Sequence, residues 1–107
     1  MLLLLAVRGC YAQEVNADAS TLIVVDLYWY ASSTPGVQYH IWIAPDAVAP
    51  NDWKWNAGKA NGKYGKGCTP HPCVAVEVGP GTHYFWVSAY DSGGESKLDG
   101  PVKAVVP

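Results

Sequence analysis

The sequence predicts an all-β chain, and three observations support this fold class. From Ser20 onward no helical period of any length occurs, whereas several segments alternate apolar and polar residues at every second position. Glycine- and proline-rich turns separate these segments. With 107 residues, of which 50% are hydrophobic and 15% charged, the chain has room for one domain with one core. We therefore expect a single folded β domain.

Residues 1–12 precede that domain and resemble the end of a secretory signal. The apolar run that begins at Leu2 is too short to span a bilayer, which takes about 20 residues. Small residues at Cys10 and Ala12 indicate cleavage after Ala12, which would leave residues 13–107 as the domain. Two alternatives stay open, namely lipidation of Cys10 and retention of the segment as a first β-strand.

The first two strands of the domain are expected at Thr21 to Ala31 and at Val37 to Ala44. A turn of serine, threonine, proline and glycine separates them, and Pro45 ends the second. Because successive side chains of a strand point to opposite faces, alternation assigns one set to the core. That set is Ile23, Val25, Leu27, Trp29, Val37, Tyr39, Ile41 and Ile43.

A stretch rich in glycine, asparagine and lysine follows between Pro50 and Gly67. Trp53 and Trp55 share a face in an alternating pattern and predict a short edge strand, whereas the remainder predicts a loop. The Gly-Lys repeats of this loop lack the GxxxxGK spacing of a phosphate-binding loop. They indicate a solvated loop, and docking of an anionic partner on its lysines is the alternative.

Three more strands are expected at Cys73 to Val78, His83 to Asp91 and Pro101 to Val106. A Gly-Pro-Gly-Thr turn separates the first two. The loop from Asp91 to Ser96 precedes the last strand. It has fewer oxygen ligands than a calcium site needs, so it predicts an ordinary turn.

Several of these motifs together resemble a fibronectin type III domain of the kind found in exported bacterial and phage proteins. The motifs are Leu27 and Trp29, Tyr39 and Ile41, the Pro-Gly-Thr turn at 80–82, Phe85 with Val87 and Ala89, and the Gly-Gly-Glu-Ser loop at 93–96. The resemblance covers about residues 22–107. It implies an immunoglobulin-like sandwich of two antiparallel sheets with seven strands.

Two features depart from the family's pattern. His83 stands where the family usually carries a buried tyrosine, and Tyr84 is displaced to the outer face. Either His83 makes the corner hydrogen bond of that tyrosine, or the register slips by one residue and Tyr84 turns inward. The family's first strand also has no clear counterpart, so either the leader supplies it or the sheet has an open edge.

The cysteines predict a disulfide. Cys68 and Cys73 enclose a short, stiff Thr-Pro-His-Pro loop, so their ends can meet in an oxidising compartment. Zinc is the alternative for this Cys-x-x-His-x-Cys pattern, but a structural zinc site needs four ligands and no second Cys/His pair follows. We expect no metal and no other cofactor.

A broad aromatic face is the most informative feature for function. If the strands at 37–44 and 83–91 are neighbours in one sheet, as the resemblance implies, their outward side chains are His40, Trp42, Tyr84, Trp86, Ser88 and Tyr90. Soluble monomers rarely expose apolar patches beyond a few hundred Å². Three alternatives stay open for what buries this face: the chain's own segment from Pro50 to Gly67, a partner protein or second copy, and a sugar.

Composition and motifs exclude several function classes. The three histidines fall on three different elements and no hydrolase or metalloprotease motif occurs, so we expect no enzyme. A net charge of −2 provides no general field for nucleic acid. We predict a non-catalytic structural or interaction module, exported to a cell or virion surface and without a membrane span. It would bind a protein partner or self-associate through Trp42, Tyr84, Trp86, Tyr90, Trp53 and Trp55, and a carbohydrate-binding module using exposed tryptophans is the alternative.

Overall fold

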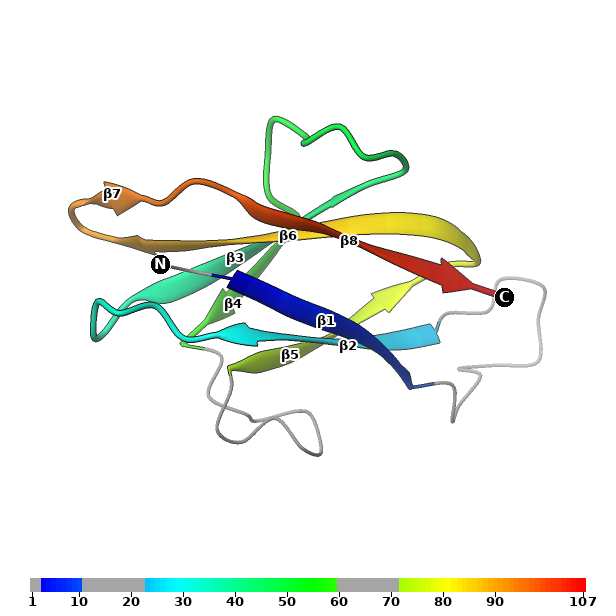
Figure 1. The fold of residues 1–107 in the computed structure, drawn as a ribbon, viewed down its shortest axis with the longest axis horizontal. Helices are drawn as coiled ribbons and strands as arrows, with labels where there is room; N and C mark the ends of the chain where they lie inside the picture. Colours follow the sequence, from blue (N-terminus) through cyan, green and yellow to red (C-terminus); the bar gives the residue numbers. More distant parts are fainter. Residues whose placement is uncertain (1–2, 11–22, 60–71) are drawn as a thin grey trace.

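The computed structural model describes residues 3–10, 23–59 and 72–107, and its regular elements in these ranges are all β-strands (Figure 1). The strands are β1 (Leu3–Cys10), β2 (Ile23–Tyr30), β3 (Gln38–Ala44), β4 (Trp55–Gly58), β5 (Cys73–Val78), β6 (Gly81–Asp91), β7 (Gly94–Glu95) and β8 (Asp99–Val106). The prediction of an all-β chain is confirmed for these residues.

The described strands form two antiparallel sheets. One has the order β1-β2-β5, and the other has the order β4-β3-β6-β7 with β8 also paired to β6. In Figure 1 the two sheets lie one over the other, with β1 and β2 on one side and β6 and β8 on the other. β3 and β6 are neighbours, in a register that runs from Gln38 opposite Tyr90 to Ala44 opposite Tyr84. This adjacency is the one that the family resemblance implied.

The main core is made of side chains from both sheets, taken at every second position. Its fully buried or nearly buried members are Val25, Leu27, Trp29, Val37, Tyr39, Ile41, Val74, Val76, Val78, Phe85, Val87, Ala89 and Val106. Burial of each large apolar side chain stabilises the fold by about 1.5–3 kcal/mol. The inward assignment along β2 and β3 is therefore correct at every position from Val25 to Ile41, and Ile43 is partly buried.

Trp29 is the largest side chain that is fully buried. Its ring packs edge-on against Tyr39, with 5.1 Å between the ring centroids. The indole nitrogen of Trp29 has no hydrogen-bond partner in the described part of the chain. A buried donor left unpaired costs about 1–3 kcal/mol. Apolar packing, and not a hydrogen bond of the indole nitrogen, therefore holds this ring in the core.

His83 occupies the corner between β5 and β6. Its Nε2 atom donates a hydrogen bond of 2.8 Å to the carbonyl oxygen of Gly79. Tyr84, the next residue, packs on the outer face against a second cluster of buried side chains. The register therefore does not slip, and of the two alternatives the corner hydrogen bond from His83 is the one that the structure has. In immunoglobulin-like domains a tyrosine makes a comparable bond to the backbone a few residues upstream.

The segment predicted as part of a leader forms β1 in this chain. It pairs with β2 from Leu3 opposite Tyr30 to Cys10 opposite Val24, with an irregularity between Leu4 and Ala6. This corresponds to the alternative in which the segment is kept as a first strand. Cleavage after Ala12, which lies outside the described residues, stays a prediction, as does lipidation of Cys10.

Trp53 and Trp55 lie on opposite sides of their sheet. β4 begins only at Trp55, which packs against the core between the sheets. Trp53 precedes the strand and stacks on His40 on the outer side of the sheet. The prediction that both tryptophans share a face is therefore wrong, because alternation applies only to residues of one regular strand. The edge strand itself is present, paired with β3.

The ends of two other predicted segments differ from the structure. The loop from Asp91 to Ser96 contains β7, which pairs back onto β6, and the last strand already begins at Asp99.

Cys73 is disulfide-bonded. Its predicted partner Cys68 lies outside the described residues, as do the glycines and lysines of residues 60–67, so the pairing stays a prediction.

Candidate functional site

The outer face of the β3–β6 pair carries the predicted aromatic side chains. Trp42 and Trp86 lie opposite each other in the register and form a second buried cluster with Ala44. Only 9% of Trp42 and 4% of Trp86 are exposed. Tyr84 and Leu98 are partly buried against them. The middle of the predicted binding face is therefore covered by the chain itself.

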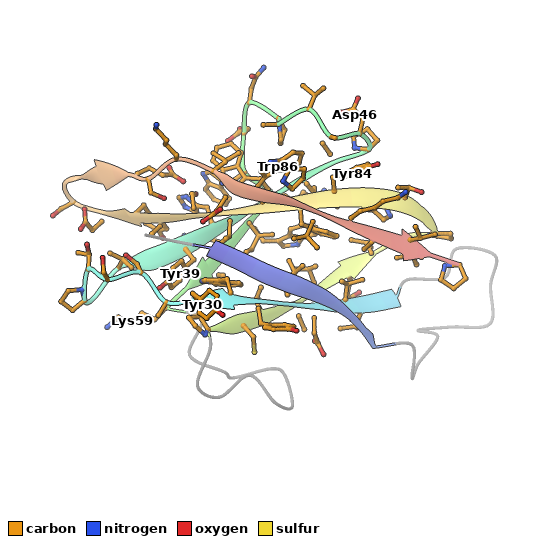
Figure 2. The ribbon with its side chains drawn as sticks, viewed as in Figure 1. Tyr30, Tyr39, Asp46, Lys59, Tyr84 and Trp86 are labelled. Atoms are coloured by element: carbon orange, nitrogen blue, oxygen red, sulfur yellow. The ribbon has the colours of Figure 1, made fainter. Side chains whose placement is uncertain are left out.

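Residues at the start of β8 lie against this second cluster. Leu98 immediately precedes β8 and Gly100 lies within it, and a Cβ atom built on Gly100 would lie 3.1 Å from Cδ1 of Trp86. The β3–β4 connection, residues 45–54, rises from the side of the sheet that faces away from β1 and β2 (Figure 1). In Figure 2 Trp86 and Tyr84 lie on that same side. Trp86 is thus enclosed by neighbouring parts of its own chain.

His40 lies between two aromatic rings. The ring of Trp53 stacks on one side, with 4.2 Å between centroids and an interplanar angle of 4°, and the ring of Tyr90 stacks on the other, at 3.8 Å and 9°. His40 is 6% exposed, whereas Trp53 is 39% exposed. The stack therefore has a buried imidazole at its centre and an exposed indole at one end, and it fixes the orientation of that indole.

Polar contacts hold the stack in place. His40 Nδ1 donates to Glu95 Oε2 at 2.8 Å, and the same oxygen accepts a hydrogen bond from the hydroxyl of Ser88. The Ser88 hydroxyl in turn accepts a bond of 2.9 Å from the indole nitrogen of Trp42. A buried polar network whose members are all paired is rigid. These bonds join β3, β6 and β7 around His40.

This environment shifts the pKa of Glu95. Partial burial is the largest single influence and raises its pKa, but the hydrogen bonds from Ser88 and His40 together with the charge of His40 outweigh it. The pKa of Glu95 is therefore lowered from its ordinary value. The carboxylate form is the one that the network stabilises.

The combination of serine, histidine and glutamate does not have the connections of a hydrolytic triad. In such a triad the serine hydroxyl bonds to the histidine, which is oriented by the acid. Here Ser88 donates to Glu95, and its side chain is fully buried. The arrangement holds side chains in position and presents no accessible nucleophile at Ser88.

The β3–β4 connection presents apolar side chains to solvent. Val48 is 71% exposed near the tip of this connection, and Trp53 is exposed near its end. The backbone is held by local bonds, from Val48 N to Asp46 Oδ1 at 3.1 Å and from Lys54 N to the carbonyl oxygen of Ile41 at 2.9 Å. Two of the four exposed large apolar side chains of the described residues lie on this one connection, the others being Tyr30 and Val105.

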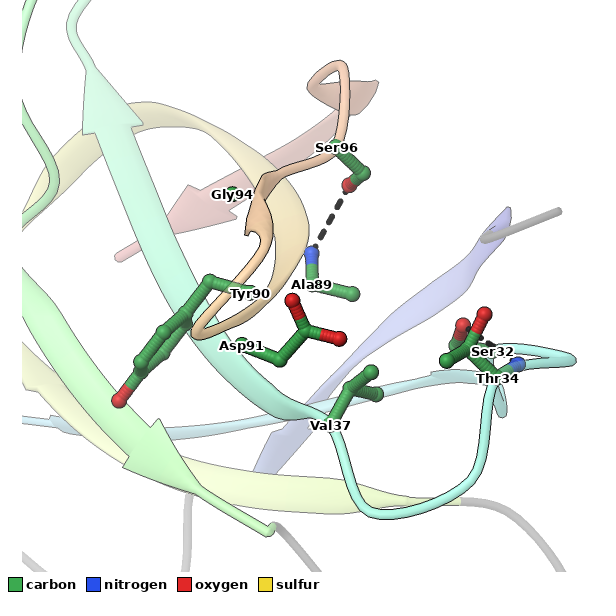
Figure 3. A pocket seen from close by; sticks show the side chains of 8 residues that line it. All are labelled: Ser32, Thr34, Val37, Ala89, Tyr90, Asp91, Gly94 and Ser96. Atoms are coloured by element: carbon green, nitrogen blue, oxygen red, sulfur yellow. Dashed lines mark hydrogen bonds between the residues drawn. The ribbon is translucent and has the colours of Figure 1, made fainter.

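A small hollow lies at the other end of the stack (Figure 3). Its volume is about 160 Å³, and its lining residues are Ser32, Thr34, Val37, Ala89, Tyr90, Asp91, Gly94 and Ser96. The hydroxyl of Ser96 accepts from Ala89 N and donates to the carbonyl oxygen of Lys97. The hydroxyl of Ser32 accepts from Thr34 N. The two serine hydroxyls are thus already bonded within the chain.

Two kinds of feature are absent from the described residues, namely clusters of metal-ligating side chains and long apolar helices. Within residues 3–10, 23–59 and 72–107, no three His, Cys, Asp or Glu side chains lie close enough together to hold a metal ion. The same part of the chain contains no helix long and apolar enough to cross a membrane.

Comparison of the chain with protein-family models, with curated proteins and with solved structures finds no match. The six residues predicted to bind a partner can therefore be assessed from the geometry of the structure alone. Of these, Trp42 and Trp86 are buried, Tyr84 and Tyr90 are half-buried, Trp55 packs inward and Trp53 reaches the surface. Sequence reasoning placed His40 and Ser88 on the correct face but missed their link to Glu95, because no periodicity relates a turn residue to strands distant in sequence.

Proposed function

We propose that this chain is a non-catalytic interaction module with an immunoglobulin-like fold of the fibronectin type III kind. Two antiparallel sheets with a common core, the pairing of β3 with β6 and the corner bond from His83 to Gly79 support this fold. The Ser88 hydroxyl is fully buried and donates to Glu95, which supports a role in holding side chains in position over one as a nucleophile.

The proposed binding surface is the β3–β4 connection, centred on Trp53 and Val48. The observation that carries it is the position of Trp53, an exposed indole whose inner side is stacked on the buried His40. Tryptophan is enriched among residues that dominate binding energy, and a ring already fixed in place loses little entropy on binding. Val48 adds an aliphatic contact on the same connection.

This surface replaces the broad aromatic sheet face that the sequence predicted as the site of binding. A protein partner, or a second copy of the chain, is the occupant that fits it best. An aliphatic side chain beside an aromatic anchor is typical of the centre of a protein interface. A carbohydrate remains the second candidate, because sugars stack on exposed indoles and Trp53 has the polar side chains of Asp52 and Lys54 as its neighbours in sequence.

We further propose that the module works outside the reducing cytoplasm, on a cell or virion surface. The disulfide at Cys73 supports this location, because disulfides form and persist mainly in oxidising compartments. Isolation of the protein from the cytoplasm with Cys73 reduced, in cells where it is active, would contradict it.

Self-association and partner binding can be tested with three variants. Trp53→Ser and Val48→Ser should both weaken binding, by roughly 2 kcal/mol for the tryptophan if it is an anchor. Val105→Ser is the matched control, because Val105 is also exposed but lies on β8. The measurements are sedimentation equilibrium for self-association, and cross-linking with mass spectrometry for a partner.

Three outcomes separate the candidates. Binding that is weakened by Trp53→Ser and Val48→Ser and kept by Val105→Ser supports a protein interface. Binding to a glycan array that depends on Trp53 and not on Val48 supports the carbohydrate alternative. Association that none of the three variants changes would contradict the proposed surface.

A further inference from the structure

The hollow of Figure 3 lies at the end of the domain where two connections approach each other. One is the β2–β3 connection, residues 31–37, and the other is the β6–β7 turn with its flanking residues, 91–94. Both lie at the same end of the two sheets in Figure 1, and both contribute lining residues. These segments are distant in sequence, so the hollow is formed only in the folded chain.

The floor of the hollow is apolar and already in place. Val37 and Ala89 line it, and both are buried members of the main core. The turn is fixed to β6 beside this floor, because Ser96 N donates to the carbonyl oxygen of Ala89 and Ala89 N donates to the hydroxyl of Ser96. A ligand would therefore meet a surface that needs no rearrangement, which is usual for binding sites.

One carboxylate faces the hollow. Alternation along β6 places Val87 and Ala89 on the inner side of the sheet, and Asp91 is the next residue of that side. In Figure 3 the carboxylate of Asp91 points into the space between Val37 and Ala89. Its Oδ1 atom accepts a hydrogen bond of 2.8 Å from Gly93 N, which fixes its orientation. Asp91 forms no ion pair with another described residue, so its charge is available to a ligand.

Hydroxyl groups line the other side of the hollow. Ser32 and Thr34 belong to the β2–β3 connection and lie across from Asp91 in Figure 3. The Ser32 hydroxyl accepts from Thr34 N at 3.2 Å, whereas the Thr34 hydroxyl has no hydrogen-bond partner among the described residues. Asp91 is the one charged residue of the lining. The hollow therefore combines a negative charge, an unused hydroxyl and an apolar floor.

A small cation on an aliphatic stem matches these walls. Its charge would pair with Asp91 and donate to the Thr34 hydroxyl, and its stem would lie on Val37 and Ala89. A volume of about 160 Å³ is below the roughly 300–1,000 Å³ of pockets for drug-sized molecules, so the bound group is small. A lysine side chain is a compact ammonium on a four-carbon stem, whereas arginine ends in a wider planar fork. We propose that this hollow binds a lysine side chain of a protein partner.

This proposal rests on the proposed function in one respect, namely that the chain binds a protein. Tyr90 connects the two regions, because it lines the hollow and stacks on His40, whose other side carries Trp53. One partner can therefore contact the exposed indole and also place a lysine in the hollow. Charge complementarity of this kind selects among partners.

A lysine probe tests the hollow without the partner. The whole chain is titrated with Nα-acetyl-L-lysine N-methylamide at constant ionic strength, and its amide NMR signals are followed. We expect saturable shifts at the amides of Val37, Asp91 and Gly94. The Nε-acetylated form of the probe keeps the stem and loses the charge. It should bind about tenfold more weakly or worse, because a charged hydrogen bond is lost. The corresponding arginine probe should also bind more weakly than the lysine probe.

A pair of variants provides the second test. Asp91→Asn removes the charge but keeps an oxygen that can accept from Gly93 N, so the turn is retained. It should weaken binding of the lysine probe about tenfold. Glu77→Gln is the control, because it removes the same charge from the exposed Glu77 of β5, outside this hollow, and should leave binding unchanged.

Several outcomes would overturn the proposal. They are an absence of saturable shifts up to the solubility of the probe, equal binding of the acetylated probe, equal binding of the arginine probe, and binding that Asp91→Asn leaves unchanged. The proposed interface fails on a different measurement, the association that Trp53→Ser and Val48→Ser should weaken. Saturable probe binding with association unchanged by those two variants would contradict that interface and support the lysine site, and the reverse result would contradict the lysine site alone.

Discussion

The Nδ1 atom of His40 lies 2.8 Å from Oε2 of Glu95, although 55 residues separate them along the chain. The contact joins the middle of β3 to the short strand β7, and it holds the imidazole in the plane in which Trp53 and Tyr90 stack on it. The surface position of Trp53 therefore depends on a buried polar contact. This dependence connects the stability of the network to the proposed binding surface.

Replacement of Glu95 by glutamine should make stability less dependent on pH in the acid range. The pKa of Glu95 in the folded chain is lowered from 4.5, so as pH falls the unfolded chain takes up a proton at Glu95 before the folded chain does. Acid therefore favours the unfolded state, and stability decreases as pH falls. The contribution is fully present above pH 4.5 and is lost as pH drops through the lower pKa of the folded state. With 34% of the side chain exposed, we expect about 1 kcal/mol at neutral pH.

Urea unfolding of the parent and of Glu95→Gln between pH 3 and 7 measures this difference. The gap between the two proteins should close as pH falls. Glu77→Gln is the control, because the exposed Glu77 makes no ion pair in the described residues. A gap that stays constant at every pH would show that Glu95 acts by packing and not by charge.

The core prediction concerns Trp29. Trp29→Ala should destabilise the domain by about 3–5 kcal/mol, a large part of the stability of a small domain. Trp29→Phe should cost clearly less, because it keeps an aromatic ring beside Tyr39 and removes an indole N–H that has no partner in the described residues. Denaturant midpoints measure both changes. If the denaturant midpoint of Trp29→Ala equals that of the parent, the core assignment is contradicted.

Gly100 should not tolerate a side chain. Its φ of +138° is rare for other residues, and a Cβ atom would lie 2.6 Å from the carbonyl oxygen of Phe85. Gly100→Ala should therefore cost about 1–3 kcal/mol. Gly79→Ala is the matched control, since nothing lies within 4 Å of a Cβ atom there and its φ is not in the left-handed range. Equal thermal midpoints for the two variants would contradict the close approach at Gly100.

The strands and the main core could be predicted from the sequence because they follow from local alternation. Leu27, Ile41 and Val87 are at inward positions of regular strands, so their burial follows from their place in the pattern. The same rule placed Trp42 and Trp86 on the outer face. Pattern thus determined which face each strand residue occupies.

What covers each face could not be predicted in the same way. Trp53 lies in an irregular connection, where alternation has no meaning, and its stacking partner His40 is on another strand. Glu95 reaches His40 only because β7 folds back onto β6. These positions depend on the paths of loops, which are set by tertiary packing and not by a repeat in the sequence.

The disulfide prediction concerns Cys68 and Cys73. Cys73 is disulfide-bonded, and the short loop between the two cysteines makes Cys68 the expected partner. Digestion and mass spectrometry without reductant should yield the two peptides linked. Reduction should cost at most about 2 kcal/mol, because the closed loop is very short. Recovery of Cys73 linked to Cys10 would show that the pairing is wrong.

Trp86→Ser distinguishes burial by the chain itself from burial by a partner. Trp86 is 4% exposed and packs with Trp42 and Ala44, so its truncation should remove about 3–5 kcal/mol of stability even in the isolated chain. Trp53→Ser should cost only about 0.5–1.5 kcal/mol, the range of one aromatic stacking contact, because much of its ring is already in water. Thermal unfolding and binding are measured for both variants. If Trp86→Ser instead unfolds like the parent and loses only binding, a partner covers the sheet face, and the β3–β4 connection is not the binding surface.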